Sequence, residues 1–519
     1  MSLPPLPAQL PAMTFLPIAD RELRVAARRR STYYIRAVTA LIALLVGGFI
    51  LIMELLSRSL GVSSGLAVGK MLFYVLSWYL FLICMLAGVF LASDCLSVER
   101  REGTLGFLFL TDLKGYDIVL GKLLAVSLNA FYGLLAVFPI FGLSLALGGI
   151  TGGEFARTCL ALTNALWFSI TAALWVSARS ELSHRAMIQT LLLLVLLVVI
   201  VPAFAARFSD LGWVSLVCSV SPYEPFYHAQ AANYPRGAGN FWSSLAMSNL
   251  AGWGFLGLAS WGLPRFLEAG AAGQKPNTWR GLLAGDLSLG RKQRRRGLLE
   301  INPVLWLLDD SRGLRWMIWG LCIVGSGLQF ACIGAMGAVV APYGAWPFYF
   351  LLKVLFAIQA CRFFGEARRA GTLELLCTTP IADKTIYAGL WLSLRRLFLW
   401  PVVVLMSVEA LCLLLSLSQT GMKGNAVMIT LSIIYGVPWQ LATSIADFFA
   451  LGWFGLWLSL TGKKPQSAAG LTILFVLVLP FVARCVPTLL IDAVFIAVCA
   501  SRLSPDFRKL VPGSDRAAR

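Results

Sequence analysis

Long apolar stretches alternate with short charged or turn-rich breaks along the whole chain. The hydrocarbon core of a bilayer is about 30 Å thick, and a helix of roughly 20 apolar residues crosses it. The first half of the chain contains stretches of this length at Tyr34–Leu56, Met71–Ser93, Leu123–Gly148, Phe155–Ala178, Ala186–Ala206 and Phe241–Leu263. The second half contains them at Trp316–Ala341, Ala345–Phe364, Leu392–Leu417, Leu441–Leu460, Ser467–Ala483 and Val486–Ser501.

The pattern predicts an all-α polytopic membrane protein with about twelve transmembrane helices in two parallel six-span repeats. Composition agrees, because 58% hydrophobic residues and 13% charged residues, with a mean hydropathy of +0.78, exceed what a soluble domain can keep in water. We expect residues 1–265 to form the first six-span domain, which includes a cytosolic N-terminal elbow. Residues 266–300 are expected to be a basic cytosolic linker, and residues 301–519 the second six-span domain.

The net charge of +18 is spread in a way that argues against nucleic-acid binding, because nearly all basic residues flank apolar spans. Lys and Arg are enriched on the cytosolic side of membrane proteins, so this distribution predicts that both termini are cytosolic. The same topology places an aromatic-rich loop, residues 207–240, outside the membrane. Residues 1–30 lack an apolar stretch followed by a small-residue cleavage site, so we expect no cleaved signal peptide.

A repeated motif follows the second predicted span of each half. The first copy, ERREGTLGFLFLTDL, begins at Glu99, and the second, EARRAGTLELLCTTPI, begins at Glu366. The copies stay in register without a gap from the arginine pairs, Arg100-Arg101 and Arg368-Arg369, through Gly121 and Gly389. This agreement indicates a duplicated functional element.

The motif predicts a turn followed by a short surface helix. Gly103 and Gly371 allow the chain to leave the preceding helix, and the residues after Thr104 and Thr372 have amphipathic spacing. Farther along, Thr111 precedes Asp112 and Thr379 precedes Pro380, which are N-cap patterns for the next helix. Each half is therefore expected to present a capped helix pair that a soluble partner could bind.

The Acid-Arg-x-x-Gly-Thr-Leu motif between spans two and three, followed by a leucine-rich turn, resembles the permease domains of type-2 ABC exporters. The resemblance covers essentially the whole chain, taken twice, as a fused pair of six-span domains. It implies a permease subunit that carries no cofactor itself and docks cytosolic ABC ATPase subunits, two of them, which hold ATP and Mg. It also implies a prokaryotic cytoplasmic (inner) membrane, where the chain would contact membrane lipid.

The resemblance assigns ATPase coupling to the matching positions of both copies. These residues are Glu99, Arg100, Gly103, Thr104, Leu105 and Thr111 in the first copy, and Glu366, Arg368, Gly371, Thr372, Leu373, Glu374 and Pro380 in the second. Two positions of the first copy depart from the second, because Gly106 stands where the second has Glu374 and Asp112 where it has Pro380. The two copies are therefore not expected to bind their ATPases identically.

No ATPase or other enzyme motif is visible on the chain itself. A P-loop needs four residues between its glycines, but Gly115 and Gly121 are separated by five, and Lys122 precedes Leu123 instead of Ser or Thr. No Ser, His and Asp pattern indicates nucleophilic catalysis. His184 and His228 have no ligand-spaced neighbours, and the cysteines form no CxxC pair, so no metal site is expected.

Ionisable residues inside predicted spans are costly and mark candidate functional positions. Lys353, Glu409 and Asp447 are candidates for a cargo translocation path, and Asp492 is a further acid inside a predicted span. The alternative is a purely structural role, in which Lys353 pairs with one acid inside the bundle or these groups lie at hydrated helix ends. Two other functions stay open: a secondary transporter driven by an ion gradient, and a membrane anchor that transports nothing.

Overall fold

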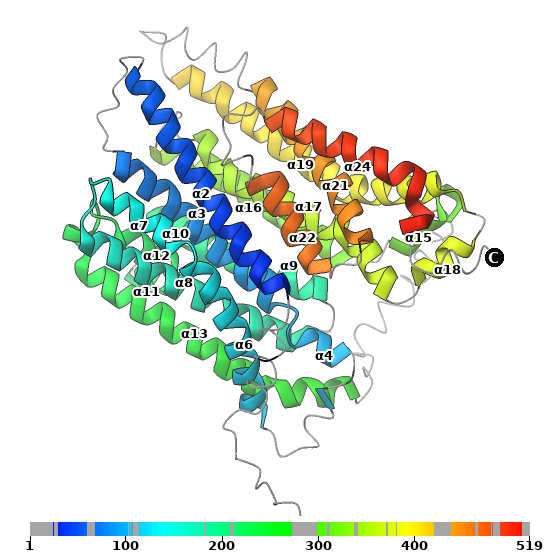
Figure 1. Cartoon of the computed structure of the whole chain (residues 1–519), viewed down its shortest axis with the longest axis horizontal. Helices are drawn as coiled ribbons and strands as arrows, with labels where there is room; N and C mark the ends of the chain where they lie inside the picture. The colour runs from blue at the N-terminus through cyan, green and yellow to red at the C-terminus, as the bar shows by residue number, and fades with distance from the viewer. Residues whose placement is uncertain are drawn as a thin grey trace, which may run out of the picture. The chain divides into compact units, whose positions relative to one another are not determined.

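The computed structural model describes residues 24, 30–59, 68–101, 103, 105–106, 114–180, 183–207, 212–271, 297, 299–308, 312–336, 341–369, 372–379, 381–419, 437–461, 465–478, 480 and 488–510. The described residues are helical almost throughout and include no strand. They form two compact units, unit 1 within Met1–Gly273 and unit 2 within Gln274–Arg519 (Figure 1). The boundary between the units falls inside the predicted linker, whose own residues lie mostly outside the described ranges.

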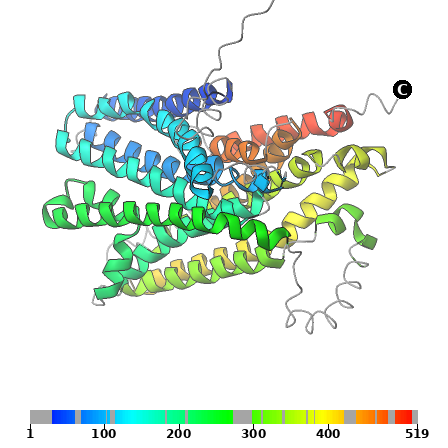
Figure 2. The same ribbon diagram turned by 90° about the horizontal axis from the view of Figure 1, so that it is seen from below.

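Unit 1 is a helical bundle built around one central helix. Its elements are α2 (Arg30–Ser59), α3 (Val68–Ala87), η1 (Gly88–Ala92), α4 (Ser97–Arg101), α6 (Gly115–Leu135), α7 (Phe138–Ala146), α8 (Gly152–Arg179), α9 (Ser183–Val195), η2 (Leu196–Ile200), α10 (Val201–Arg207), α11 (Gly212–Ser219), α12 (Tyr223–Ala229) and α13 (Tyr234–Ala271). Helix α8 is the centre, because it packs against α3, η1, α6, α9, α12 and α13. The long helices of unit 1 run side by side in both views (Figures 1 and 2).

Small and polar side chains allow α8 to take this central position. Gly88 of η1 lies so close to α8 that an added Cβ would be 2.3 Å from the carbonyl oxygen of Ser169. The Ser169 hydroxyl donates to the carbonyl of Cys84 at 2.6 Å, and Asn164 donates to Ser248 of α13 at 2.7 Å. Close backbone approach and hydrogen bonds between helices are the usual basis of helix association inside a membrane.

Unit 2 has a corresponding centre in α17. Its elements are α15 (Pro303–Leu308), α16 (Arg312–Met336), α17 (Ala341–Arg369), α18 (Thr372–Thr378), α19 (Asp383–Gln419), α21 (Val437–Leu460), α22 (Pro465–Ile473), η4 (Leu474–Val478) and α24 (Thr488–Leu510). Helix α17 packs against α16, α19, α21 and α22, and α21 also packs against α24.

Seven helices within the described ranges are long and apolar enough to cross a membrane: Val68–Arg101, Gly115–Ala146, Gly152–Arg179, Ser183–Ala205, Phe348–Arg368, Asp383–Leu411 and Ala442–Leu460. Each overlaps a predicted span. Thr39–Ile52, Leu314–Gly327, Pro465–Val478 and Thr488–Cys499 are apolar but shorter, and they overlap four further predictions. The predicted span Phe241–Leu263 is helical within α13 but is not among the seven, since its Gly, Ser and Asn residues reduce its hydropathy. These helices indicate an integral membrane protein. The total of twelve transmembrane spans in two repeats stays a prediction.

Candidate functional site

The turn between η1 and α4 directly precedes the first copy of the repeated motif, and polar contacts hold this turn to two other helices. Asp94 accepts hydrogen bonds from the hydroxyls of Ser97, at 3.0 Å, and Ser183 at the start of α9. The Ser177 hydroxyl of α8 accepts from the backbone N–H groups of Leu96 and Ser97, both at 3.1 Å. Helix α4 therefore begins at a buried position fixed by α8 and α9.

Glu99 forms a nearly buried ion pair that joins α4 to α6. Its Oε1 lies 2.5 Å from Nζ of Lys122, with the two side chains 19% and 10% exposed. The pair connects the predicted coupling motif to the helix that leads into the third predicted span. Sequence reasoning singled out Glu99 but gave no reason to choose Lys122 as its partner.

Beyond Arg101 the chain turns as the motif predicts. Gly103 has a φ of +72°, the left-handed region that favours glycine, and a Cβ added there would meet nothing within 4 Å. Leu105, next in the motif, is 1% exposed and anchors the chain after the turn. Thr104 and Thr111 lie outside the described residues, so their predicted roles stay predictions.

The second copy of the motif spans the end of α17 and the short helix α18. Glu366 pairs with Arg362 one turn earlier on α17, at 3.1 Å. Leu373 is 1% exposed, whereas the next two residues, Glu374 and Leu375, are exposed, Leu375 to 68%. Helix α18 thus buries one leucine and presents an acid and a second leucine on its surface. Gly371, Pro380 and the Thr372 side chain lie outside the described residues.

The two copies make the same contact with the end of another helix. Nη1 of Arg100 donates to the carbonyl of Arg179, the last residue of α8, at 3.3 Å. The aligned Arg368 donates through Nη1 to the carbonyl of Leu460, the last residue of α21. Leu105 and Leu373, also aligned, have the same 1% exposure. We call these two places the first and second arginine contacts.

The fifth predicted span of each half has one more common feature. A π-helical segment interrupts it at η2 (Leu196–Ile200) in unit 1 and at η4 (Leu474–Val478) in unit 2. Such bulges are rare in helices and occur often at functional sites. Nothing in the apolar pattern of these spans signalled the bulges.

The candidate path residues separate into two places in unit 2. Nζ of Lys353 on α17 lies 2.5 Å from Oδ2 of Asp447 on α21. Glu409 on α19 is 7% exposed, and its charge acts on the phenol of Tyr349, one turn from Lys353 on α17. The structure thus joins two of the three predicted residues directly and places the third close to Tyr349.

The segment predicted to lie outside the membrane, residues 207–240, contains helices that the sequence pattern did not indicate, and its side of the membrane stays a prediction. Helices α11 and α12 lie within it and α13 begins at Tyr234, because side chains distant in sequence stabilise this segment. Phe226 of α12 stacks on Phe81 at 4.5 Å between ring centroids. The buried carboxylate of Glu154 accepts from the N–H of Ala231 at 2.8 Å, and Arg157 lies 3.7 Å over the Tyr234 ring.

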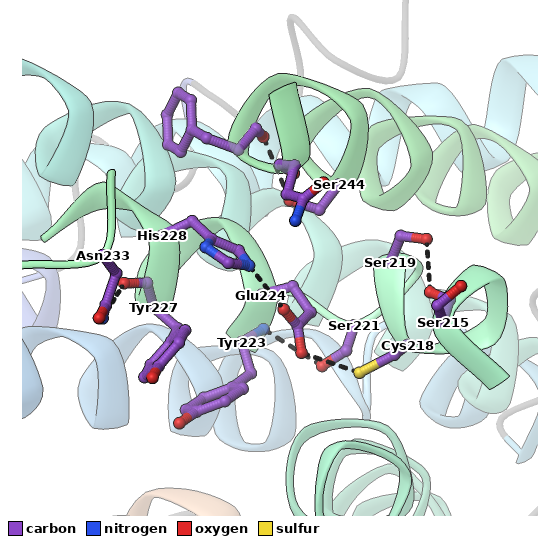
Figure 3. A network of polar contacts seen from close by, with 12 residues as sticks. Ser215, Cys218, Ser219, Ser221, Tyr223, Glu224, Tyr227, His228, Asn233 and Ser244 are labelled. Carbon is purple, nitrogen blue, oxygen red and sulfur yellow. Dashed lines mark hydrogen bonds and ion pairs between the residues drawn. The ribbon is translucent and has the colours of Figure 1, made fainter. Parts of the chain in front are cut away.

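Glu224 is the centre of a polar cluster in this segment (Figure 3). One carboxylate oxygen accepts from the Cys218 thiol at 2.8 Å, and the other lies 3.3 Å from Nε2 of His228. Burial alone would raise the pKa of Glu224, but the hydrogen bonds from His228 and Cys218 outweigh it and hold that pKa below its ordinary value. Burial, and then the Glu224 carboxylate, raise the pKa of the Cys218 thiol.

Among the described side chains, no group of three or more His, Cys, Asp or Glu is arranged to hold a metal ion. The chain matches no known family model, and no curated protein shows significant sequence similarity to it.

Proposed function

We propose that the chain is the membrane-spanning permease subunit of an ATP-driven exporter, in which two six-span units are fused and separate cytosolic ATPase subunits supply the energy. The first and second arginine contacts carry the proposal. A duplicated motif with the same buried leucine and the same contact to a helix end is what two equivalent coupling elements require. The proposed two-repeat arrangement is further supported by the π segments, which occur in the fifth span of both halves.

Each coupling element would transmit movement of a docked ATPase into the bundle. A force on α18 reaches α17 through the chain itself and α21 through Arg368. In unit 1, a force on α4 reaches α8 through Arg100 and α6 through the Glu99–Lys122 pair. ATP and Mg would be held by the partner, because the chain carries no P-loop pattern.

The exposed face of α18 is the proposed docking surface in unit 2. Glu374 and Leu375 provide a charge and an apolar contact there, and neither side chain is needed to fill the core. The residues between Gly106 and Lys114 would provide the docking surface of unit 1. Interface energy usually concentrates in a few such residues.

The test is a mild-detergent affinity purification of the tagged chain from its own host, followed by an ATPase assay of the eluate. We expect an ATPase to co-purify with the wild-type chain and to be lost with Leu375→Glu. The matched control is Leu299→Glu, which places the same change at another exposed leucine of unit 2 and should retain the ATPase. A chain that purifies alone under all detergents tried, or an ATPase retained by Leu375→Glu, would contradict the proposal.

The two alternatives give different results in the same preparation. A secondary transporter would move cargo in ATP-free liposomes when an ion gradient is imposed. A membrane anchor would retain the ATPase, but its ATP hydrolysis would be unchanged by reconstitution and no cargo would cross. The exporter predicts ATP-dependent movement that requires both chains.

A further inference from the structure

Three ionisable side chains from three helices of unit 2 meet in its interior. Lys353 and Asp447 form the 2.5 Å pair, with both side chains 14% exposed. Asp492 of α24 is 0% exposed, and its carboxyl group lies within hydrogen-bonding reach of Asp447. We call Lys353, Asp447 and Asp492 the triad.

The charges of the triad do not balance. Two carboxyl groups share one ammonium, and no donor among the described residues serves either oxygen of Asp492. Tyr349, one turn along α17 from Lys353, and Glu409 of α19, whose charge acts on Tyr349, add no positive charge. Counting only the residues that the structure describes, the triad needs one more positive charge or one proton to balance its two carboxylates.

Two facing carboxylates cannot both be ionised in an apolar interior with a single cation, because each desolvated negative charge destabilises the other. A proton on Asp492 removes this repulsion and also satisfies the hydrogen bonds. Protonated Asp492 donates to Asp447, whose Oδ2 still accepts from Lys353. We propose that unit 2 binds one proton, shared between the carboxyl groups of Asp447 and Asp492.

The proton site is separate from the coupling element. Lys353 lies near the middle of α17, and about 24 Å of helix separates it from Arg369 at the C-terminal end. Helix α24 packs against α21, so loss of the proton would set two carboxylates against each other across that contact. Proton occupancy therefore controls how α24 packs on α21, and it does so whether or not an ATPase is bound.

Infrared difference spectroscopy of the purified chain in lipid nanodiscs tests the proposal, because protonated carboxyl groups have their own carbonyl-stretch band. At about pH 7, where an ordinary Asp is ionised, we expect Asp492→Asn to lose the intensity of one protonated carboxyl. Asp447→Asn should lose the same intensity, since the remaining acid then pairs with Lys353 alone. The double variant should lose no more than either single variant, because one proton is shared. Lys353→Met should gain one carboxyl, because both acids then need a proton.

Controls separate this site from other acids and from metal cations. Glu300→Gln alters an exposed acid outside the proposed docking surface and should leave the band unchanged. The asparagine variants are near-isosteric, and size-exclusion elution and thermal unfolding will show that each is folded. An unchanged band in Asp492→Asn, or a double variant that loses twice the intensity, would overturn the shared proton. A band that disappears when sodium replaces choline in the buffer would assign the site to a metal cation instead and would also overturn it. None of these outcomes depends on capture of an ATPase.

Discussion

Glu99 and Lys122 form a nearly buried ion pair, with Oε1 and Nζ 2.5 Å apart, that joins the first copy of the repeated motif to α6. The aligned positions in unit 2 are Ala367 and Leu390, and Leu390 is 2% exposed. The same place is thus occupied by a charged pair in one unit and by apolar residues in the other.

Removal of one partner should destabilise unit 1, and replacement of both should not. Lys122→Leu leaves Glu99 without its cation, and loss of one member of a buried pair typically costs about 3–5 kcal/mol. The double variant Glu99→Ala/Lys122→Leu copies unit 2 and should recover most of that loss. Thermal unfolding of the purified wild type and the two variants checks this. A double variant less stable than Lys122→Leu would show that the pair is not equivalent to its apolar counterpart.

Gly103→Ala should destabilise the turn after α4 through its backbone alone. A left-handed conformation costs a residue with a Cβ roughly 1–2 kcal/mol, and the open space around Gly103 excludes a steric clash. Gly106→Ala is the matched control, because its surroundings are equally open and its φ is not positive. Limited trypsin digestion at Arg100 and Arg101 should be faster in Gly103→Ala and unchanged in Gly106→Ala. Equal digestion of both variants would exclude a backbone requirement at Gly103.

The Glu224 cluster should lose its stabilising effect in acid. Because the pKa of Glu224 is lower in the folded chain than its ordinary value of 4.5, the folded state favours the carboxylate. The resulting stability is fully present above that ordinary value and is lost as the pH falls through the lower folded pKa. Thermal unfolding across this acid range should show a steeper fall for the wild type than for Glu224→Gln. Identical pH slopes would mean that Glu224 gains nothing from Cys218 and His228.

Cys218 should resist maleimide at neutral pH. The thiol is 5% exposed, and burial together with the Glu224 carboxylate raises its pKa, so little reactive thiolate is present. Glu224→Ala removes the acceptor and the negative charge and should increase the labelling rate by about tenfold. Mass spectrometry of the Cys218 peptide measures the rate. His228→Ala, which keeps the Cys218–Glu224 bond, is the control and should label slowly.

The apolar pattern predicted the described spanning helices well, because length and hydropathy follow directly from bilayer thickness. The repeated motif predicted the turn at Gly103, which depends on one local backbone conformation. The apolar pattern missed α11 and α12, whose stability comes from Phe81 and Glu154, residues far away in the sequence. For the same reason the motif identified Glu99 and Arg368 but not Lys122 and the Leu460 carbonyl, since the partner of a polar side chain is set by tertiary packing.

The arginine contacts also act on the dipoles of the helices that they touch. The C-terminal end of a helix carries a partial negative charge and carbonyls without intrahelical donors. Arg100 and Arg368 bring a positive charge and an N–H donor to that end of α8 and α21. Withdrawal of either arginine would remove this compensation, at a cost of about 0.3–1 kcal/mol for a solvent-exposed helix end. A movement of Arg100 or Arg368 must therefore either move the end of α8 or α21 with it or supply the free energy that breaks the contact.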